Sequence, residues 1–173
     1  APEKAGGFRA DDGEARTGPV LEVEDLWYSY VSDAGRGGDA EWALRDVSLR
    51  IPAGRVVALV GHTGSGKTTL PPHPNGLYSP NHGTVRFRGD DVTGRNSTAV
   101  AGDVGYVFQN PDTQIFTTTV RKEVRYGPEN LGYDDVEERV RRALRQVDLG
   151  DRVDERTSNL SGGEKQRVAI ASV

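Results

Sequence analysis

One short segment constrains this chain more than any other. It reads Gly61-His62-Thr63-Gly64-Ser65-Gly66-Lys67-Thr68 and fits the pattern G-x-x-x-x-G-K-[ST]. Glycine permits a tight loop whose backbone N–H groups converge on phosphate oxygens, and a following helix would point its positive end at the same anion. The continuously apolar run 56–60 precedes the loop, which favours a parallel strand buried on both faces. The sequence therefore predicts a phosphate-binding loop.

The side chains of this loop predict how a nucleotide would be held. Lys67 would reach the β- and γ-phosphates, and the Thr68 hydroxyl would bind Mg²⁺. The motif by itself indicates a P-loop nucleotide-binding protein, without separating kinases, GTPases, helicases and transport ATPases. The residues expected to contact the nucleotide here are Gly61, Gly64, Ser65, Gly66, Lys67, Thr68 and Thr69.

A second motif, LSGGEKQR, covers residues 160–167. Ser161 and Glu164 have the S-x-x-E spacing of a capping box, so we expect a helix over 161–173 whose N-terminus forms another anion site. The segment resembles the LSGGQ signature of the ATP-binding-cassette family, with Glu164 in place of glutamine. That resemblance implies that Ser161, Gly162 and Gly163 close over the ATP of a second ATPase subunit, identical or related, so that two ATP molecules lie head to tail between the subunits.

Two more segments resemble elements of the same family. The stretch 106–111 is similar to the Q-loop, which implies that Gln109 approaches Mg²⁺ and the attacking water. The resemblance thus implies Gln109 and Lys67 as catalytic residues, and Thr68 and Gln109 as metal ligands. Tyr30 lies upstream of the P-loop at the family's spacing for an aromatic ring that stacks on adenine, with Tyr28 as the second choice. Ordinary strand packing is the alternative for either tyrosine.

The stretches 107–116, 118–120 and 126–132 resemble one subgroup, the ATPases of energy-coupling-factor importers, which take up cobalt, nickel or vitamins. A neighbouring class of importer is the alternative. The implied fold is an α/β P-loop NTPase of cassette type, with an antiparallel β-subdomain, an incomplete RecA-like nucleotide-binding core and a helical subdomain. The implied function is that of an ATP-hydrolysing motor subunit on the cytoplasmic face of the membrane, bound to an integral membrane transporter subunit. A binding-only or decayed cassette ATPase, and a soluble cassette ATPase not tied to transport, are the alternatives.

The chain divides by pattern into four stretches. We expect a disordered tail over 1–19, the β-subdomain and P-loop core over 20–110, the helical subdomain over 111–160 and the signature helix from 161 to 173. Strands are predicted near 20–30, 42–51, 84–88 and 104–108, and 32–39 reads as a loop. The clearest helix is 135–147, which Asp134 or Asp135 can cap and which Gly150 follows.

Composition and two departures from the family pattern limit what the chain does. A net charge of −4 argues against nucleic acid as a partner, and the absence of cysteine excludes disulfides. Pro71, Pro72 and Pro74 follow the P-loop, where each proline lacks a helical N–H, so about one helical turn at most is expected after Lys67. The family's Asp-Glu strand does not occur in these 173 residues, so the catalytic glutamate is absent and little ATP hydrolysis is expected from them alone.

Overall fold

The computed structural model describes residues 18–31 and 41–173. The expected loop 32–39 and all but the end of the expected tail 1–19 lie outside these residues. The chain forms two compact units, one ending at Val104 and one running from Gly105 to Val173. Within the described residues, no helix has both the length and the apolar character needed to cross a membrane.

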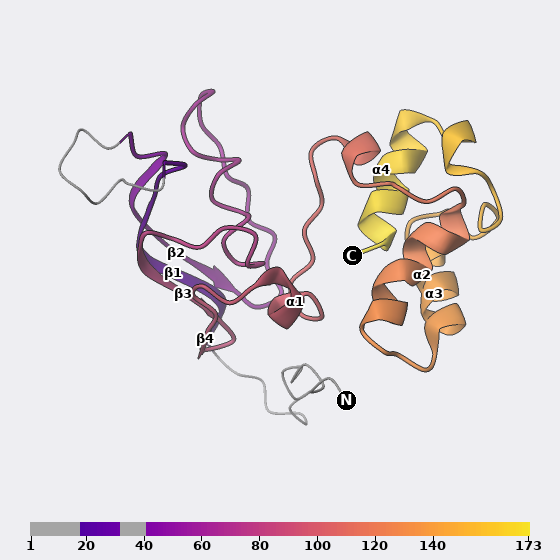
Figure 1. Cartoon of the computed structure of the whole chain (residues 1–173), viewed down its shortest axis with the longest axis horizontal. Helices are drawn as coiled ribbons and strands as arrows, with labels where there is room; N and C mark the ends of the chain where they lie inside the picture. The colour runs from indigo at the N-terminus through magenta and orange to yellow at the C-terminus, as the bar shows by residue number, and fades with distance from the viewer. Residues whose placement is uncertain (1–17, 32–40) are drawn as a thin grey trace. The chain divides into compact units, whose positions relative to one another are not determined.

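The first unit contains a four-stranded antiparallel sheet (Figure 1). Its strands, in the order β2-β1-β3-β4, confirm the strands expected near 20–30, 42–51 and 84–88 to within a few residues. At the centre of the sheet, Val23 of β1 lies opposite Leu49 of β2 and Val85 of β3. The elements of this unit are β1 (Pro19–Tyr28), β2 (Leu44–Pro52), β3 (His82–Phe87), β4 (Asp90–Asp91) and the short helix α1 (Ser97–Val100).

The two faces of this sheet differ in polarity, as expected when side chains alternate along a strand. On the solvent side Glu24 of β1 receives a 2.6 Å ion pair from Arg86 and a 3.4 Å one from Arg50. The hydrogen bond and charge of Arg86 lower the pKa of Glu24 below its usual value. The buried face and the segments that pack on it form one core, made of Val23, Leu26, Leu44, Leu70, Val85, Phe87, Val92 and Val100.

Two expected strands do not form. The segment 56–60, predicted as a buried parallel strand, has irregular backbone, and Val56 and Val60 are 101% and 89% exposed. The segment 104–108 is irregular as well. A strand needs a hydrogen-bonded neighbour, and the described residues supply none to either segment. The strand prediction was therefore wrong for both segments, because neither has a pairing partner within residues 18–31 and 41–173.

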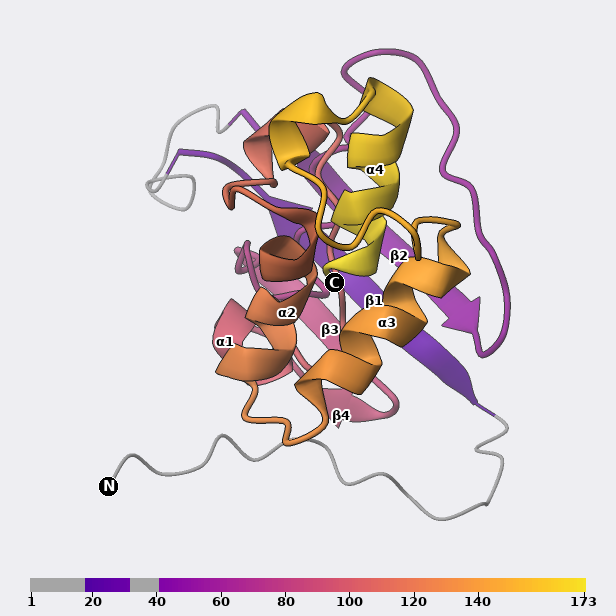
Figure 2. The same ribbon diagram turned by 90° about the vertical axis from the view of Figure 1, so that its right-hand side faces the viewer.

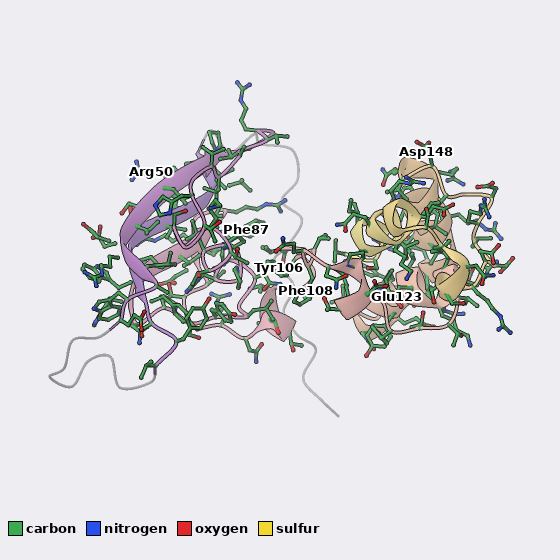
Figure 3. All side chains as sticks on the ribbon, turned by 90° about the horizontal axis from the view of Figure 1, so that it is seen from above. Arg50, Phe87, Tyr106, Phe108, Glu123 and Asp148 are labelled. Atoms are coloured by element: carbon green, nitrogen blue, oxygen red, sulfur yellow. The ribbon has the colours of Figure 1, made fainter. Side chains whose placement is uncertain are left out.

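The second unit is helical (Figure 2). Its helices pack around Val120, Val124, Val140, Leu144, Leu149, Leu160 and Val168. Figure 3 shows Glu123 inside this unit, where the side chain is 3% exposed and its carboxylate accepts the backbone N–H groups of Phe116 and Thr117. The elements are the 3-10 turns η1 (Pro111–Thr113) and η2 (Thr157–Asn159) and the helices α2 (Val120–Asn130), α3 (Val136–Gln146) and α4 (Gly162–Ala171).

Helix α3 confirms the helix expected at 135–147, with different chemistry at its ends. Asp135 occupies the N-cap position but forms no capping hydrogen bond; it pairs instead with Arg139 at 2.7 Å. The left-handed residue after the helix is Asp148, with φ 56°, rather than the expected Gly150. Asp148 (labelled in Figure 3) lets the N–H of Leu149 reach the carbonyl of Leu144 at 2.8 Å, which closes a Schellman-type end.

Candidate nucleotide-binding loops

The segment 61–68 forms a loop that requires glycine at several positions. Gly64 and Gly66 both have φ of 84°, a conformation that side chains with a Cβ rarely adopt. A Cβ on Gly66 would also lie 2.6 Å from Leu44 Cδ2 and 3.1 Å from the carbonyl oxygen of Ala43. The Cβ of any residue replacing Gly61 would meet Ser65 Oγ at 2.7 Å. The loop path therefore depends on the glycines that the motif supplies.

Lys67 closes the loop on itself. Its Nζ donates hydrogen bonds to the carbonyl oxygens of Gly61 (2.8 Å) and His62 (2.6 Å) and to Ser65 Oγ (3.2 Å). Three neutral oxygen atoms of the loop thus hold the Lys67 ammonium group. An ammonium group held by neutral oxygens would exchange them favourably for phosphate oxygens, because charge-assisted hydrogen bonds are the stronger ones.

The donor set of the loop fits a magnesium–nucleotide. The Thr68 side chain is exposed, and within the described part of the chain its hydroxyl has no hydrogen-bond partner, so it is available as an oxygen ligand for Mg²⁺. Lys67 adds a positive charge whose three present partners are all neutral oxygens of the loop. His62 lies on the exposed side, bonded to the carbonyl oxygen of Thr63 at 2.8 Å.

The chain beyond the loop does not continue as an α-helix. The N–H of Leu70 reaches the carbonyl of Gly66 at 3.1 Å, which completes one helical turn, and residues 71–76 then form turns. This outcome confirms the expectation of about one turn at most. The reason is that Pro71, Pro72 and Pro74 have no N–H to continue the helical ladder. Leu70 is buried in the core of the first unit and anchors this end of the loop there.

Tyr30 lies next to the P-loop segment. Its hydroxyl is 3.0 Å from Thr69 Oγ1, and its ring meets the rings of Tyr28 and Tyr78 at near right angles, yet the residue is 62% exposed. Tyr28 is packed instead, stacked on Tyr78 at 5.1 Å and edge-on to His73 at 4.8 Å. Burial lowers the pKa of His73, which keeps its ring neutral among these aromatic groups. The arrangement favours Tyr30 over Tyr28 as the ring that faces a base.

The LSGG segment forms the capped start of α4. Ser161 Oγ accepts the N–H of Glu164, and Glu164 Oε2 accepts the N–H of Ser161 at 2.8 Å, so the expected helix and capping box are confirmed. Glu164 Oε2 also accepts the Ser161 hydroxyl at 2.7 Å. These hydrogen bonds lower the pKa of Glu164, so its carboxylate is ionised at neutral pH. Gly162 and Gly163 are exposed, and their N–H groups lie in the first turn of the helix.

Gln109 lies on an exposed bend just before η1. The two residues around it are held: the N–H of Phe108 donates to Gln114 Oε1 at 3.0 Å, and Asn110 caps η1 by accepting the N–H of Asp112 at 3.0 Å. Tyr106 and Phe108, labelled in Figure 3, pack edge to face at 5.1 Å. Sequence reasoning assigned no role to Gln114, although it lies within a stretch that matched the importer subgroup.

The predicted residues fall into two groups. Those of the P-loop and Tyr30 belong to the first unit, and Gln109 and the LSGG residues belong to the second. Their roles in binding and catalysis stay predictions.

Comparison with known proteins identifies the kind of domain. The family model described as "ABC transporter" matches residues 44–173. The energy-coupling factor transporter ATP-binding protein EcfA1 of Bacillus subtilis is 44% identical over 156 residues, which is 89% of this chain and 54% of the relative. EcfA1 of Methanospirillum hungatei is 41% identical over 156 residues, again 89% of this chain and 54% of the relative.

A solved structure of an ABC transporter component has a similar fold. CbiO1 of Clostridium perfringens, described as part of the ABC transporter complex cbiONQ, superposes with a TM-score of 0.76 at 33% identity, covering 90% of this chain and 61% of that one. The likeness confirms the expected fold class, an α/β P-loop cassette with an antiparallel sheet and helices. The chain spans about half the length of these curated relatives, 54% in each case.

Proposed function

Because this chain belongs to the ABC transporter family, we propose that its parent protein is the ATP-hydrolysing motor subunit of an importer of the energy-coupling-factor type. The observation that supports the proposal is a pair of separate motifs, one in each unit: the glycine-dependent loop closed by Lys67, and the Ser161-capped start of α4. We propose that both bind phosphate oxygens. A kinase or GTPase would need only the first of these motifs. A cassette ATPase needs both, because each nucleotide is held by the P-loop of one subunit and the signature of another.

We propose the following roles for these residues in nucleotide binding and hydrolysis. Lys67 transfers its hydrogen bonds from the carbonyls of Gly61 and His62 to phosphate oxygens, and Thr68 ligates Mg²⁺, which supplies charge neutralisation at the phosphates. Tyr30 stacks on the adenine while its hydroxyl stays on Thr69. Gln109 orients the attacking water and is a second Mg²⁺ ligand.

Ser161, Gly162 and Gly163 close on the nucleotide of a second subunit, identical or related. Their N–H groups at the positive end of α4 would stabilise the γ-phosphate only when the two subunits approach. Closure is then a population shift driven by contacts that exist only in the dimer. In this proposal ATP hydrolysis belongs to the parent protein, where the family resemblance implies a glutamate that polarises the attacking water.

The transport role rests on the relatives. EcfA1 proteins are named as transporter ATP-binding proteins, and CbiO1 is described as part of a transporter complex. We therefore propose an integral membrane subunit as partner, a peripheral position at the cytoplasmic face of the membrane, and cobalt, nickel or a vitamin as cargo.

Nucleotide titration tests the first half of the proposal. We expect Lys67→Ala in the full-length protein to weaken binding of radiolabelled ATP by about 10- to 100-fold, since a charged hydrogen bond is worth about 1.5–3 kcal/mol. Lys122→Ala, which removes an exposed lysine from α2, is the matched control and should bind as the wild type does. Equal affinity of the Lys67→Ala variant and the wild type would remove the P-loop from the mechanism.

Two further readouts separate the rival functions. ATP binding without turnover would support a binding-only subunit. Recovery of the full-length protein wholly in the soluble fraction, with no integral membrane protein attached, would contradict the importer role while leaving ATP hydrolysis intact.

A further inference from the structure

The segment that carries Gln109 is fastened to α4 by a single amide side chain. Gln114 Oε1 accepts the N–H of Phe108 at 3.0 Å, and Gln114 Nε2 donates to the carbonyl oxygen of Ala169 at 2.8 Å and to Ser172 Oγ at 3.2 Å. The acceptor and both donors of one amide are therefore used, which is close to the full capacity of the group. These contacts join the residue before Gln109 to the C-terminal end of the signature helix.

The position of these contacts on α4 explains why they matter. The last four carbonyls of a helix have no partner within it, and Ala169 lies in the last turn of α4. Ala169 is fully buried, so its carbonyl needs a partner other than bulk water. Gln114 and the Ser172 hydroxyl, at 2.8 and 3.0 Å, provide it. Loss of the Gln114 amide would leave this carbonyl and the Phe108 N–H each with one partner fewer.

A second tie joins the same segment to the other end of α4. Asp112 of η1 accepts from Lys165 Nζ at 2.7 Å, and Lys165 lies in the turn that follows the LSGG residues. The Asp112 side chain is 64% exposed and that of Lys165 25%, so this pair contributes less than the half-buried Gln114 amide. Together the two ties attach residues 108–114 along the length of α4, from the turn behind Ser161 to Ser172.

We propose that Gln114 is a positioning residue that makes the Gln109 segment and the signature helix move as one body. This inference rests on the proposed function, in which Ser161 contacts the nucleotide of the second subunit and Gln109 acts on the nucleotide of its own. A helix that shifts when its N-terminus closes on one nucleotide would carry Gln109 with it, through the Gln114 amide. The amide thus couples the two ATP sites of the dimer, and its loss uncouples them without removing any group that touches ATP.

Substitutions at 114 can separate the two halves of the tie. Gln114→Leu removes all three hydrogen bonds and leaves an apolar side chain that is one atom shorter. Gln114→Glu keeps an acceptor for Phe108 but replaces the donor that faces the Ala169 carbonyl with an oxygen. Gln146→Glu, on the exposed surface of α3, makes the same chemical change where no such tie exists and serves as the control.

The first measurement needs no nucleotide. Amide hydrogen exchange in the full-length protein should show the Phe108 N–H exchanging at least about tenfold faster in Gln114→Leu than in the wild type, since that variant removes its acceptor. The control should exchange as the wild type does, and circular dichroism should show unchanged helix content in all variants. Unchanged exchange at Phe108 in Gln114→Leu would overturn the structural basis of the proposal.

The second measurement tests the coupling. The wild type should hydrolyse ATP with a Hill coefficient above one, and both Gln114 variants should lower it to about one while binding ATP within about twofold of the wild-type affinity. A Hill coefficient unchanged by either substitution, or a wild-type value of one, would overturn the coupling and leave the ATPase assignment standing. Failure of the wild type to bind ATP at all would overturn the proposed function itself, and the coupling with it.

Discussion

At the scale of single residues, Glu164 places a negative charge in the first turn of α4, beside the LSGG segment. Its carboxylate accepts both the N–H and the hydroxyl of Ser161, so that hydroxyl points at a negative group. A triphosphate approaching the same helix start would meet the carboxylate charge, and the Ser161 proton would have to leave Glu164 to reach a phosphate oxygen. Glutamine would keep the capping geometry without the charge. The residue therefore stabilises the helix start and opposes anion binding there.

We expect Glu164→Gln to strengthen ATP-dependent association of the full-length subunits about two- to fivefold at low salt, and less at high salt because the charge is screened. Analytical ultracentrifugation with ATP measures this. The pKa of Glu164 is lowered, so the capping interaction of the ionised form is present above the unfolded-state pKa and is lost as pH falls through the lowered folded-state pKa. The advantage of the variant should accordingly persist from pH 6 to 8. Glu155→Gln removes a nearby carboxylate that does not touch Ser161 and should leave association unchanged.

At the scale of elements, the sequence correctly predicts those features that residues close together in the chain determine. The capping box of Ser161 and Glu164 depends on a four-residue pattern, and it forms as predicted. The strand at 56–60 depends on a pairing partner that a local pattern cannot supply, and it does not form. Gln114 reaches Ala169 across 55 positions, so periodicity and motif spacing give no sign of that tie.

Helix α2 and the end of α3 also differ from what local sequence patterns predict. The helix α2 escaped prediction because Pro128 interrupts its pattern, yet the Thr119 cap and the buried pair Val120 and Val124 hold it together. Glycine is the usual residue with left-handed backbone at the end of a helix, and for this reason the sequence predicted that α3 ends near Gly150. The chain turns at Asp148 because that position, one residue past the C-cap, places Leu149 in the core.

The segment after the P-loop leads to a prediction about a helix that does not form there. Replacing Pro71, Pro72 and Pro74 together by alanine restores three N–H groups and removes the ring clashes, each worth about 3 kcal/mol in a helix interior. We expect the region after Thr68 to become helical and ATP binding to tighten at least about threefold, because a helix would brace the loop and add its positive end. Far-UV circular dichroism and a nucleotide titration on the full-length protein measure both effects.

Pro128→Ala provides the control for that experiment. It makes the same change inside α2, where the helix already continues past the proline. Its ATP affinity should equal that of the wild type. If the triple variant gains neither helix nor affinity, the turns at 71–76 are set by their surroundings and not by the prolines.

At the scale of the whole molecule, each unit has an apolar core of its own, and the two cores share no residue. Stability should therefore be divided between two cooperative transitions rather than concentrated in one. The chain contains two tryptophans, Trp27 and Trp42, and both lie in the first unit. The helices longer than one turn lie in the second among the described residues. Tryptophan fluorescence thus reports one unit, and ellipticity at about 222 nm mainly the other.

A matched pair of core substitutions tests that division in urea unfolding of the 173-residue chain. Leu26 and Leu144 are both 0% exposed, one in each core, and truncation to alanine at such sites costs about 2–5 kcal/mol. Leu26→Ala should lower the midpoint of the fluorescence transition and leave that of the ellipticity transition in place. Leu144→Ala should do the reverse. If either variant shifts both midpoints equally, the two units unfold as one body, and the stability of the signature helix would then depend on the core of the first unit.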